Sequence, residues 1–167
     1  QMCIRDRIVP ILKQSLKKMD YMKRAEGEAL SKDLQQRLEQ IARQLEGIKY
    51  QFPAHLESYQ NRFRERLQSL LGGIEVDPSR FQQEVALLAE RTDITEEITR
   101  AESHLAQFAA MLEGEDPVGR KMDFLLQEIY REVNTISAKA NDAEISQRVV
   151  DIKAELEKIR EQVQNIE

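Results

Sequence analysis

The sequence has few of the residues that build disulfide bridges, turns and aromatic cores. Its 167 residues include one cysteine, no tryptophan, six glycines and four prolines, and aromatic residues make up only 5% of the chain. A single cysteine excludes an internal disulfide and a cluster of thiolate metal ligands. The shortage of glycine and proline leaves little material for the many turns that a β-sheet protein needs. These absences argue against a disulfide-bonded domain and against β-structure.

Long hydrophobic segments are absent as well. No apolar run approaches the roughly 20 residues that a membrane-spanning helix requires, and no segment has the charged start, apolar middle and cleavage site of a signal peptide. We therefore expect a cytoplasmic protein with no membrane partner. The net charge of −5 argues against indiscriminate nucleic-acid binding, which depends on many lysine and arginine contacts to phosphates, but it allows local basic patches.

The chain is rich in charge and in strong helix formers. Charged residues make up 33% of the sequence, a composition typical of long helices and coiled coils. No segment shows the apolar–polar alternation of a strand. The predicted fold is all-α: a long helical hairpin is followed by a bundle of shorter helices that ends in an antiparallel helix pair.

The hairpin is predicted over residues 8–71. Apolar residues recur there every three or four positions and mark a seam for a partner helix. The seam comprises Leu30, Leu34, Leu38, Ile41, Leu45 and Ile48. Pro53 disfavours helical geometry at Phe52 and suits the first turn of a new helix, so a turn is expected there. A kinked continuous helix would give the same pattern. Gly72 and Gly73 are expected to end the segment.

Residues 79–167 are predicted to form a second, helical domain. A short helix is expected from Ser79 to Arg91, and Thr92 offers an N-cap for the helix that follows. The segment from Gly114 to Gly119 is the clearest loop in the chain.

Two amphipathic helices end the chain. The apolar stripe of the first comprises Met122, Leu125, Leu126, Ile129, Val133 and Ile136. Asn141 or Asp142 can cap the second. Its seam comprises Ile145, Val149, Ile152, Leu156, Ile159, Val163 and Ile166. So regular a seam requires a packed partner, most simply the preceding helix in antiparallel contact.

Beside its stripe, each terminal helix carries a row of polar residues. Helical periodicity places each row on one face, so the rows converge if the two helices pair through their stripes. Spacing alone favours an ordinary solvated surface. The rows are Asp123, Gln127, Arg131 and Asn134 on the first helix, and Lys153, Glu157, Arg160, Gln164 and Glu167 on the second.

Several sequence blocks resemble the C-terminal domain of the YicC/YloC family of bacterial endoribonucleases. They are GRKMDFLLQE, REVNT, KANDAEI and REQVQNIE near the C-terminus, with MKRAEGEALSKDL and EVALLAERTDITEEITRAESHLAQF upstream. The resemblance extends from about Met22 to the last residue. It departs from the family pattern at Tyr130, where asparagine is usual, and at Ser137 to Lys139. Residues 1–7 match nothing in the family and are expected to be a non-native leader.

The resemblance implies a function and partners. It implies an endoribonuclease that assembles as a homo-oligomer and carries a large N-terminal domain ahead of Met22, which is missing here. Because the polar rows lie in the best-matching blocks, the resemblance favours an RNA surface over a solvated face. Arginine and lysine there would bind phosphates, and asparagine and glutamine would hold bases or riboses. The RNA-binding candidates are Arg120, Gln127, Arg131, Asn134, Lys139, Lys153, Arg160 and Gln164.

The acids in the matching blocks favour a metal-dependent route. Hydrolysis of RNA by such a route needs carboxylates that hold a hard cation such as Mg²⁺ or Mn²⁺. Glu128, Glu132 and Glu161 are the catalytic candidates, and Glu128, Glu132, Asp142 and Glu157 are the candidate metal ligands. The metal-free route needs a general base, usually histidine. His55 and His104 lie outside the terminal blocks and are interpreted as partly exposed helix residues.

Two other functions remain open on the sequence. The chain is alternatively a non-catalytic interaction module with the long hairpin as an assembly arm, or a coiled-coil adaptor whose polar rows bind protein. The sequence contains no glycine-rich phosphate loop, nucleophile elbow or zinc-binding HExxH pair that would indicate another enzyme class.

Overall fold

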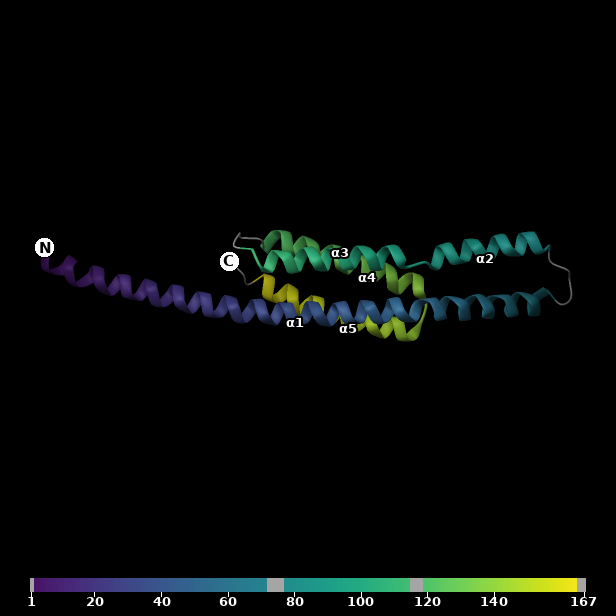
Figure 1. Ribbon diagram of the computed structural model, residues 1–167, viewed down its shortest axis with the longest axis horizontal. Helices are drawn as coiled ribbons and strands as arrows, with labels where there is room; N and C mark the ends of the chain where they lie inside the picture. Colours follow the sequence, from purple (N-terminus) through teal and green to yellow (C-terminus); the bar gives the residue numbers. More distant parts are fainter. Residues whose placement is uncertain (1, 72–76, 115–118, 165–167) are drawn as a thin grey trace. The chain divides into compact units, whose positions relative to one another are not determined.

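The computed structural model describes residues 2–71, 77–114 and 119–164, and nearly all of these residues lie in helices (Figure 1). The helices are α1 (Met2–Leu71), α2 (Pro78–Thr92), α3 (Thr95–Leu112), α4 (Gly119–Ala140) and α5 (Ala143–Val163). The described residues contain no strand, so the predicted all-α class is confirmed. None of these described helices combines the length and the apolar character needed to cross a bilayer.

The chain divides into two compact units, Gln1–Gln36 and Arg37–Glu167. The first unit is the N-terminal part of α1. Many of its apolar side chains, such as Ile11 and Met22, are exposed. The second unit contains the rest of α1 and all the shorter helices. The residues that carry the family resemblance most specifically lie in this second unit.

Helix α1 continues through Pro53 without a turn. The hairpin predicted over residues 8–71 is therefore not formed, and the alternative of a continuous helix is the one observed. Proline in a helix interior removes one backbone hydrogen bond and crowds the preceding turn. Side-chain contacts on both sides offset this cost, because Gln51 and His55 flank Pro53 and both reach residues at the start of α5. The contacts between α1 and the start of α5 thus outweigh the tendency of Pro53 to end the helix.

The core of the second unit is formed by α1 from Arg37 onward together with α3, α4 and α5. Helix α4 packs against both α3 and α5. All of the apolar stripe predicted for α4 is buried, and so are the described members of the α5 seam. The part of the α1 seam in this unit is buried as well, and comprises Leu38, Ile41, Leu45 and Ile48.

The starts of α2, α3 and α5 are set by acidic side chains. Asp77 accepts a hydrogen bond from the Ser79 N–H at the start of α2. The cap predicted at Thr92 is wrong, because that residue ends α2 and its hydroxyl bonds back to the carbonyl of Leu88 at 2.9 Å. Asp93 instead accepts a hydrogen bond at 2.8 Å from the N–H of the first residue of α3.

The turn between α4 and α5 consists of Asn141 and Asp142. Asn141 has a φ of 45°, a left-handed conformation that asparagine tolerates better than most residues. Asp142 then caps α5 and accepts hydrogen bonds from the backbone N–H groups of Glu144 and Ile145. The cap predicted at residues 141–142 is therefore confirmed at Asp142. The predicted end at Gly72 and Gly73, most of the loop from Gly114 to Gly119, and the seam and row residues Ile166 and Glu167 lie outside the described residues.

Candidate functional site

The two polar rows of the terminal helices converge where α4 and α5 pack together. Arg160 Nε on α5 lies 3.6 Å from Asp123 Oδ1 on α4. Further along the pair, the Lys153 amine lies over the Tyr130 ring, 5.5 Å from the ring centroid. The first residues of α4 thus face the last residues of α5, which is the antiparallel arrangement expected from the sequence.

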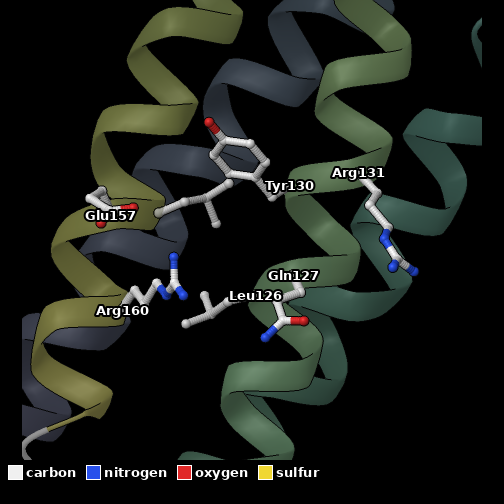
Figure 2. Close-up of a pocket in the computed structure, with 7 residues that line it drawn as sticks. Leu126, Gln127, Tyr130, Arg131, Glu157 and Arg160 are labelled. Atoms are coloured by element: carbon white, nitrogen blue, oxygen red, sulfur yellow. The ribbon is translucent and has the colours of Figure 1, made fainter.

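A groove of about 400 Å³ lies between the two rows. Its lining comprises Leu126, Gln127, Tyr130, Arg131, Leu156, Glu157 and Arg160. The two leucines are buried and form an apolar floor, while the polar side chains form the rim. Figure 2 shows Arg160 extending from α5 toward α4, whereas Arg131 points away from α5.

The charged groups at this groove are only partly neutralised. Gln127 donates a hydrogen bond of 2.8 Å to Asp123 Oδ2. The other oxygen, Oδ1, is buried and accepts no hydrogen bond from the described residues, although Arg160 lies nearby. The Arg160 side chain is 46% exposed, so its guanidinium retains donors that face solvent. An anion reaching the groove would meet this guanidinium and the Lys153 amine.

Comparison with known proteins assigns these residues to a family. Residues 48–167 match the family described as "Endoribonuclease YicC-like, C-terminal". A protein of Clostridioides difficile (strain 630) named "Probable endoribonuclease YicC" is 40% identical over 157 residues, which cover 93% of this chain and 54% of that protein. The chain belongs to the YicC-like family.

A second YicC-like relative supports the same assignment. A protein of the same name from Haemophilus influenzae is 38% identical over 146 residues, which cover 87% of this chain and 50% of that protein. The chain thus spans about half the length of the curated relatives it matches. The family resemblance read from the sequence is confirmed.

The four candidate metal ligands of this YicC-like chain are not gathered at one point. Glu128 and Glu132 lie on the side of α4 that faces α3, because Glu132 is 3.6 Å from Arg100 of α3. Glu157 lines the groove on the other side of α4. Asp142 lies in the α4–α5 turn. Among the described residues, no three acidic, histidine or cysteine side chains are placed to hold a metal ion together. The predicted four-carboxylate site is therefore not assembled, and the residues do not fit a cation held by protein ligands alone.

Asp142 and Lys139 have structural partners that the sequence did not reveal. Asp142 Oδ2 lies 2.9 Å from His55 Nδ1. The hydrogen bond from the Ile145 N–H, aided by the nearby His55, lowers the pKa of the Asp142 carboxyl. The Lys139 amine donates to the Asp93 carbonyl at 3.0 Å and to Glu97 Oε1 at 2.6 Å. Both side chains hold helices together. The sequence predicts Asp142 as a metal ligand and Lys139 as an RNA ligand, and it does not reveal this structural role.

The remaining candidates are exposed and lie outside the groove. They are Arg120, Asn134, Glu161 and Gln164. The sequence interpretation missed Tyr130 as a groove residue and noted it only as a departure from the family pattern. It also missed Arg148, which lines a second groove of about 590 Å³ between α1 and α5. Residue spacing along α5 does not reveal the role of Arg148, because its hydrogen-bond partners lie in α1, about 100 positions earlier in the chain.

Proposed function

We propose that this chain is the RNA-contacting helical part of an endoribonuclease and that the α4–α5 groove binds single-stranded RNA. The observation that carries the proposal is the convergence of Arg160, Lys153 and Tyr130 around one groove. The family match and the names of both relatives support RNA cleavage as the activity.

Each groove side chain suits a part of a nucleotide. Arg160 presents a planar fork that pairs with two phosphate oxygens, and Lys153 adds a second positive charge. Tyr130, whose side chain is 41% exposed, offers a face on which an unpaired base stacks. Gln127 and Glu157 present donors and acceptors to base edges or ribose hydroxyls. This combination favours a single strand, because bases inside an RNA helix are stacked on each other and closed to a tyrosine.

The catalytic roles of Glu128, Glu132 and Glu161 remain proposals. Glu132 is buried beside Arg100, and Glu128 accepts a hydrogen bond of 2.7 Å from Arg131. These partners place both acids next to cationic side chains that attract phosphate. Dependence on Mg²⁺ or Mn²⁺ stays a prediction of the sequence. We assign no step to a cation, because the described residues gather no complete ligand set.

Self-association also stays a prediction of the family resemblance. Light scattering on the chain over a range of concentrations tests it, and a mass equal to one chain at every concentration would contradict it.

RNA binding and cleavage are tested in one experiment. A fluorescently labelled RNA with a single-stranded loop is titrated with the chain, and a DNA of the same sequence serves as the control. Cleavage is then followed on a gel in EDTA, in Mg²⁺ and in Mn²⁺. Binding of the RNA with internal cleavage supports the proposal. Binding without cleavage under all three conditions favours the non-catalytic interaction module, and no binding rejects the groove as an RNA site.

A further inference from the structure

The groove of about 590 Å³ between α1 and α5 presents a different face of α5 from the groove between α4 and α5. The residues that α5 contributes to one groove are distinct from those that it contributes to the other. Helix α5 is therefore a wall shared by both grooves. The floor of the α1–α5 groove includes the buried side chains of Ile41 and Ile152, and its cationic side chains are Arg43, Arg148 and Lys158.

Two uncharged side chains of α1 hold Arg148 at this groove. Its Nε donates to Gln51 Oε1 at 3.1 Å, and its Nη1 donates to Gln44 Oε1 at 2.8 Å. Gly47 lies between these glutamines in the sequence, and a Cβ there would stand 2.7 Å from the Nη1 atom. The guanidinium is thus fixed before a ligand arrives, and a group that is already fixed loses less conformational freedom on binding.

These contacts leave the positive charge of Arg148 without a counter-charge. Among the described residues, no carboxylate forms an ion pair with this half-buried side chain. Charged groups that are withdrawn from water are normally paired, because desolvation of an unpaired charge is costly. A guanidinium carries several N–H donors, and the glutamines occupy two of them. An anion in the groove would supply the missing charge and accept hydrogen bonds from the remaining donors.

The other charged side chains at this groove add to the excess of positive charge. Arg43 is exposed and forms no ion pair in the part of the chain that the structure describes. Glu155 is paired twice, with Arg37 at 2.9 Å and with Lys158 at 2.6 Å. Asp151 is the other acid among the described lining residues. The groove is therefore locally cationic, although the whole chain has a net charge of −5.

We propose that the α1–α5 groove is a second RNA-contact site, in which Arg148 and Arg43 bind phosphate groups. This inference rests on the proposed function, because the ligand is the same single-stranded RNA. The planar fork of Arg148 suits two oxygens of one phosphate, and Arg43 adds a second cation. The buried Ile41 and Ile152 offer an apolar surface to a base.

A strand that occupies both grooves contacts two faces of α5. Single-strand binding sites in other proteins cover about 4–16 nucleotides, so one strand can extend from the first groove into the second. Each groove contributes its own cations. Arg160 and Lys153 serve the α4–α5 groove, and Arg148 and Arg43 serve the α1–α5 groove.

The test measures binding of a labelled single-stranded RNA of about 16 nucleotides over a range of salt concentrations. Arg43→Gln and Arg148→Gln are compared with the wild-type chain. Arg66→Gln is the matched control, since Arg66 is an exposed arginine of α1 outside the groove. We expect each groove variant to weaken binding about tenfold, as loss of a hydrogen bond to a charged group does. The slope of log K against log salt should fall by about 1 in each, and the control should keep the wild-type slope.

Arg43→Gln separates RNA contact from a structural role. Arg148 also holds α5 to α1, so its replacement can weaken RNA binding through a loss of stability. Arg43 has no such contact among the described residues, and urea unfolding of Arg43→Gln should match that of the wild-type chain. A weaker RNA complex with unchanged stability in this variant supports the inference.

A second measurement observes Arg148 directly. Its Nε–H is held in a hydrogen bond to Gln51, and it gives an NMR signal that is assigned by its loss in Arg148→Gln. Saturation of the wild-type chain with the same RNA should shift this signal.

Two outcomes overturn the inference. The first is a wild-type affinity and salt slope in Arg43→Gln, even if Arg148→Gln binds weakly, and the second is an unshifted Arg148 signal at saturation. Either leaves the proposed function intact if Arg160→Ala still weakens the binding of RNA. A wild-type chain that does not bind RNA rejects the proposed function and this inference with it.

Discussion

The guanidinium of Arg148 on α5 lies so close to Gly47 on α1 that a Cβ at Gly47 would stand 2.7 Å from its Nη1 atom. From there Arg148 donates to Gln44 Oε1 at 2.8 Å and to Gln51 Oε1 at 3.1 Å. A glycine within a helix costs about 1 kcal/mol relative to alanine. The absence of a side chain at Gly47 is therefore what admits Arg148 and lets one residue bond to two turns of α1.

We expect Gly47→Ala to couple strongly to Arg148. In the wild-type chain the new methyl group displaces the guanidinium, and the loss of two hydrogen bonds, about 1 kcal/mol each, outweighs the gain in helix propensity. In an Arg148→Ala chain the same change should raise the free energy of unfolding by about 1 kcal/mol, because only the propensity gain remains. A double-mutant cycle in urea measures the difference. Equal effects of Gly47→Ala in both chains would contradict the close packing.

Arg160→Ala should weaken RNA binding and flatten its dependence on salt. One phosphate contact and its released counterion are lost, so the slope of log K against log salt should fall by about 1. Stability should change little, because a partly exposed ion pair with an N–O distance of 3.6 Å contributes at most about 1 kcal/mol. Arg91→Ala, an exposed arginine on α2, removes the same charge outside the groove and should leave the slope unchanged. A lower melting temperature with an unaltered slope would show that Arg160 is a structural clamp.

Tyr130→Ala should weaken binding of single-stranded RNA, whereas Tyr130→Phe should not. Stacking of a base on an aromatic ring contributes about 1–3 kcal/mol, so the alanine variant should bind roughly 5- to 150-fold more weakly. Phenylalanine keeps the ring face over which Lys153 lies. Fluorescence anisotropy with a labelled oligonucleotide measures both. If both variants bind RNA equally weakly, the loss of the hydroxyl group explains the effect and base stacking does not.

Replacing both Glu128 and Glu132 by glutamine should lower RNA cleavage at least about tenfold and leave helicity unchanged. Glutamine keeps the size and helix propensity of glutamate but loses the charge that a cation or the neighbouring guanidinium of Arg100 or Arg131 requires. Gel assays of cleavage and circular dichroism of the double variant measure the two effects. The single variants then separate the contributions of the two acids. Cleavage at the wild-type rate by the double variant would exclude Glu128 and Glu132 as catalytic acids. The remaining candidates would then be Asp142, Glu157 and Glu161.

Stability should fall in acid. The pKa of Asp142 is lowered mainly by the hydrogen bond from the Ile145 N–H, and that of Glu155 is lowered mainly by the hydrogen bond from Lys158, with help from Arg37. A pKa that is lower in the folded state gives stability that is complete above the unfolded value and is lost as pH falls toward the folded value. Unfolded carboxyls titrate near pH 4, so the loss should begin there and deepen below it. Urea unfolding between pH 7 and pH 3 measures the trend.

Asp142→Asn provides the control for the acid effect. Asparagine caps a helix about as well as aspartate but carries no charge. The variant should therefore keep α5 and show a smaller loss of stability between pH 5 and pH 3 than the wild-type chain. An identical pH dependence in the two chains would mean that Asp142 does not contribute to it.

The sequence alone predicts which residues of α4 and α5 are buried. Spacings of three and four residues identify the stripes of α4 and α5, since side chains at these spacings lie on one face of any helix. The same geometry predicts that the row with Gln127 and the row with Arg160 share an edge of the helix pair. An acidic residue just before a helix also indicates where the helix starts, as Asp142 does for α5. These are short-range properties, and tertiary context altered few of them.

The partners across helices were not predictable in this way. The sequence shows Glu128, Glu132, Asp142 and Glu157 as acids in one region, but helix rotation sends the first two toward α3, the last toward the groove and Asp142 to His55. Which side chains meet depends on the rotation and register of whole helices, to which many weak contacts contribute together.

Two features of the fold depend on contacts between residues far apart in the chain. By itself the sequence determined an all-α chain, its apolar stripes and its polar rows, because helix periodicity is a property of neighbouring residues. Only the tertiary structure decided that α1 continues through Pro53, since contacts from α5 at Gln51 and His55 hold both sides of the proline in line. It also decided that Arg148 of α5 bonds to Gln44 and Gln51 of α1 across Gly47. The physical reason is the same in both cases: the stabilising contacts join residues far apart in the chain, and their geometry exists only after the helices have packed.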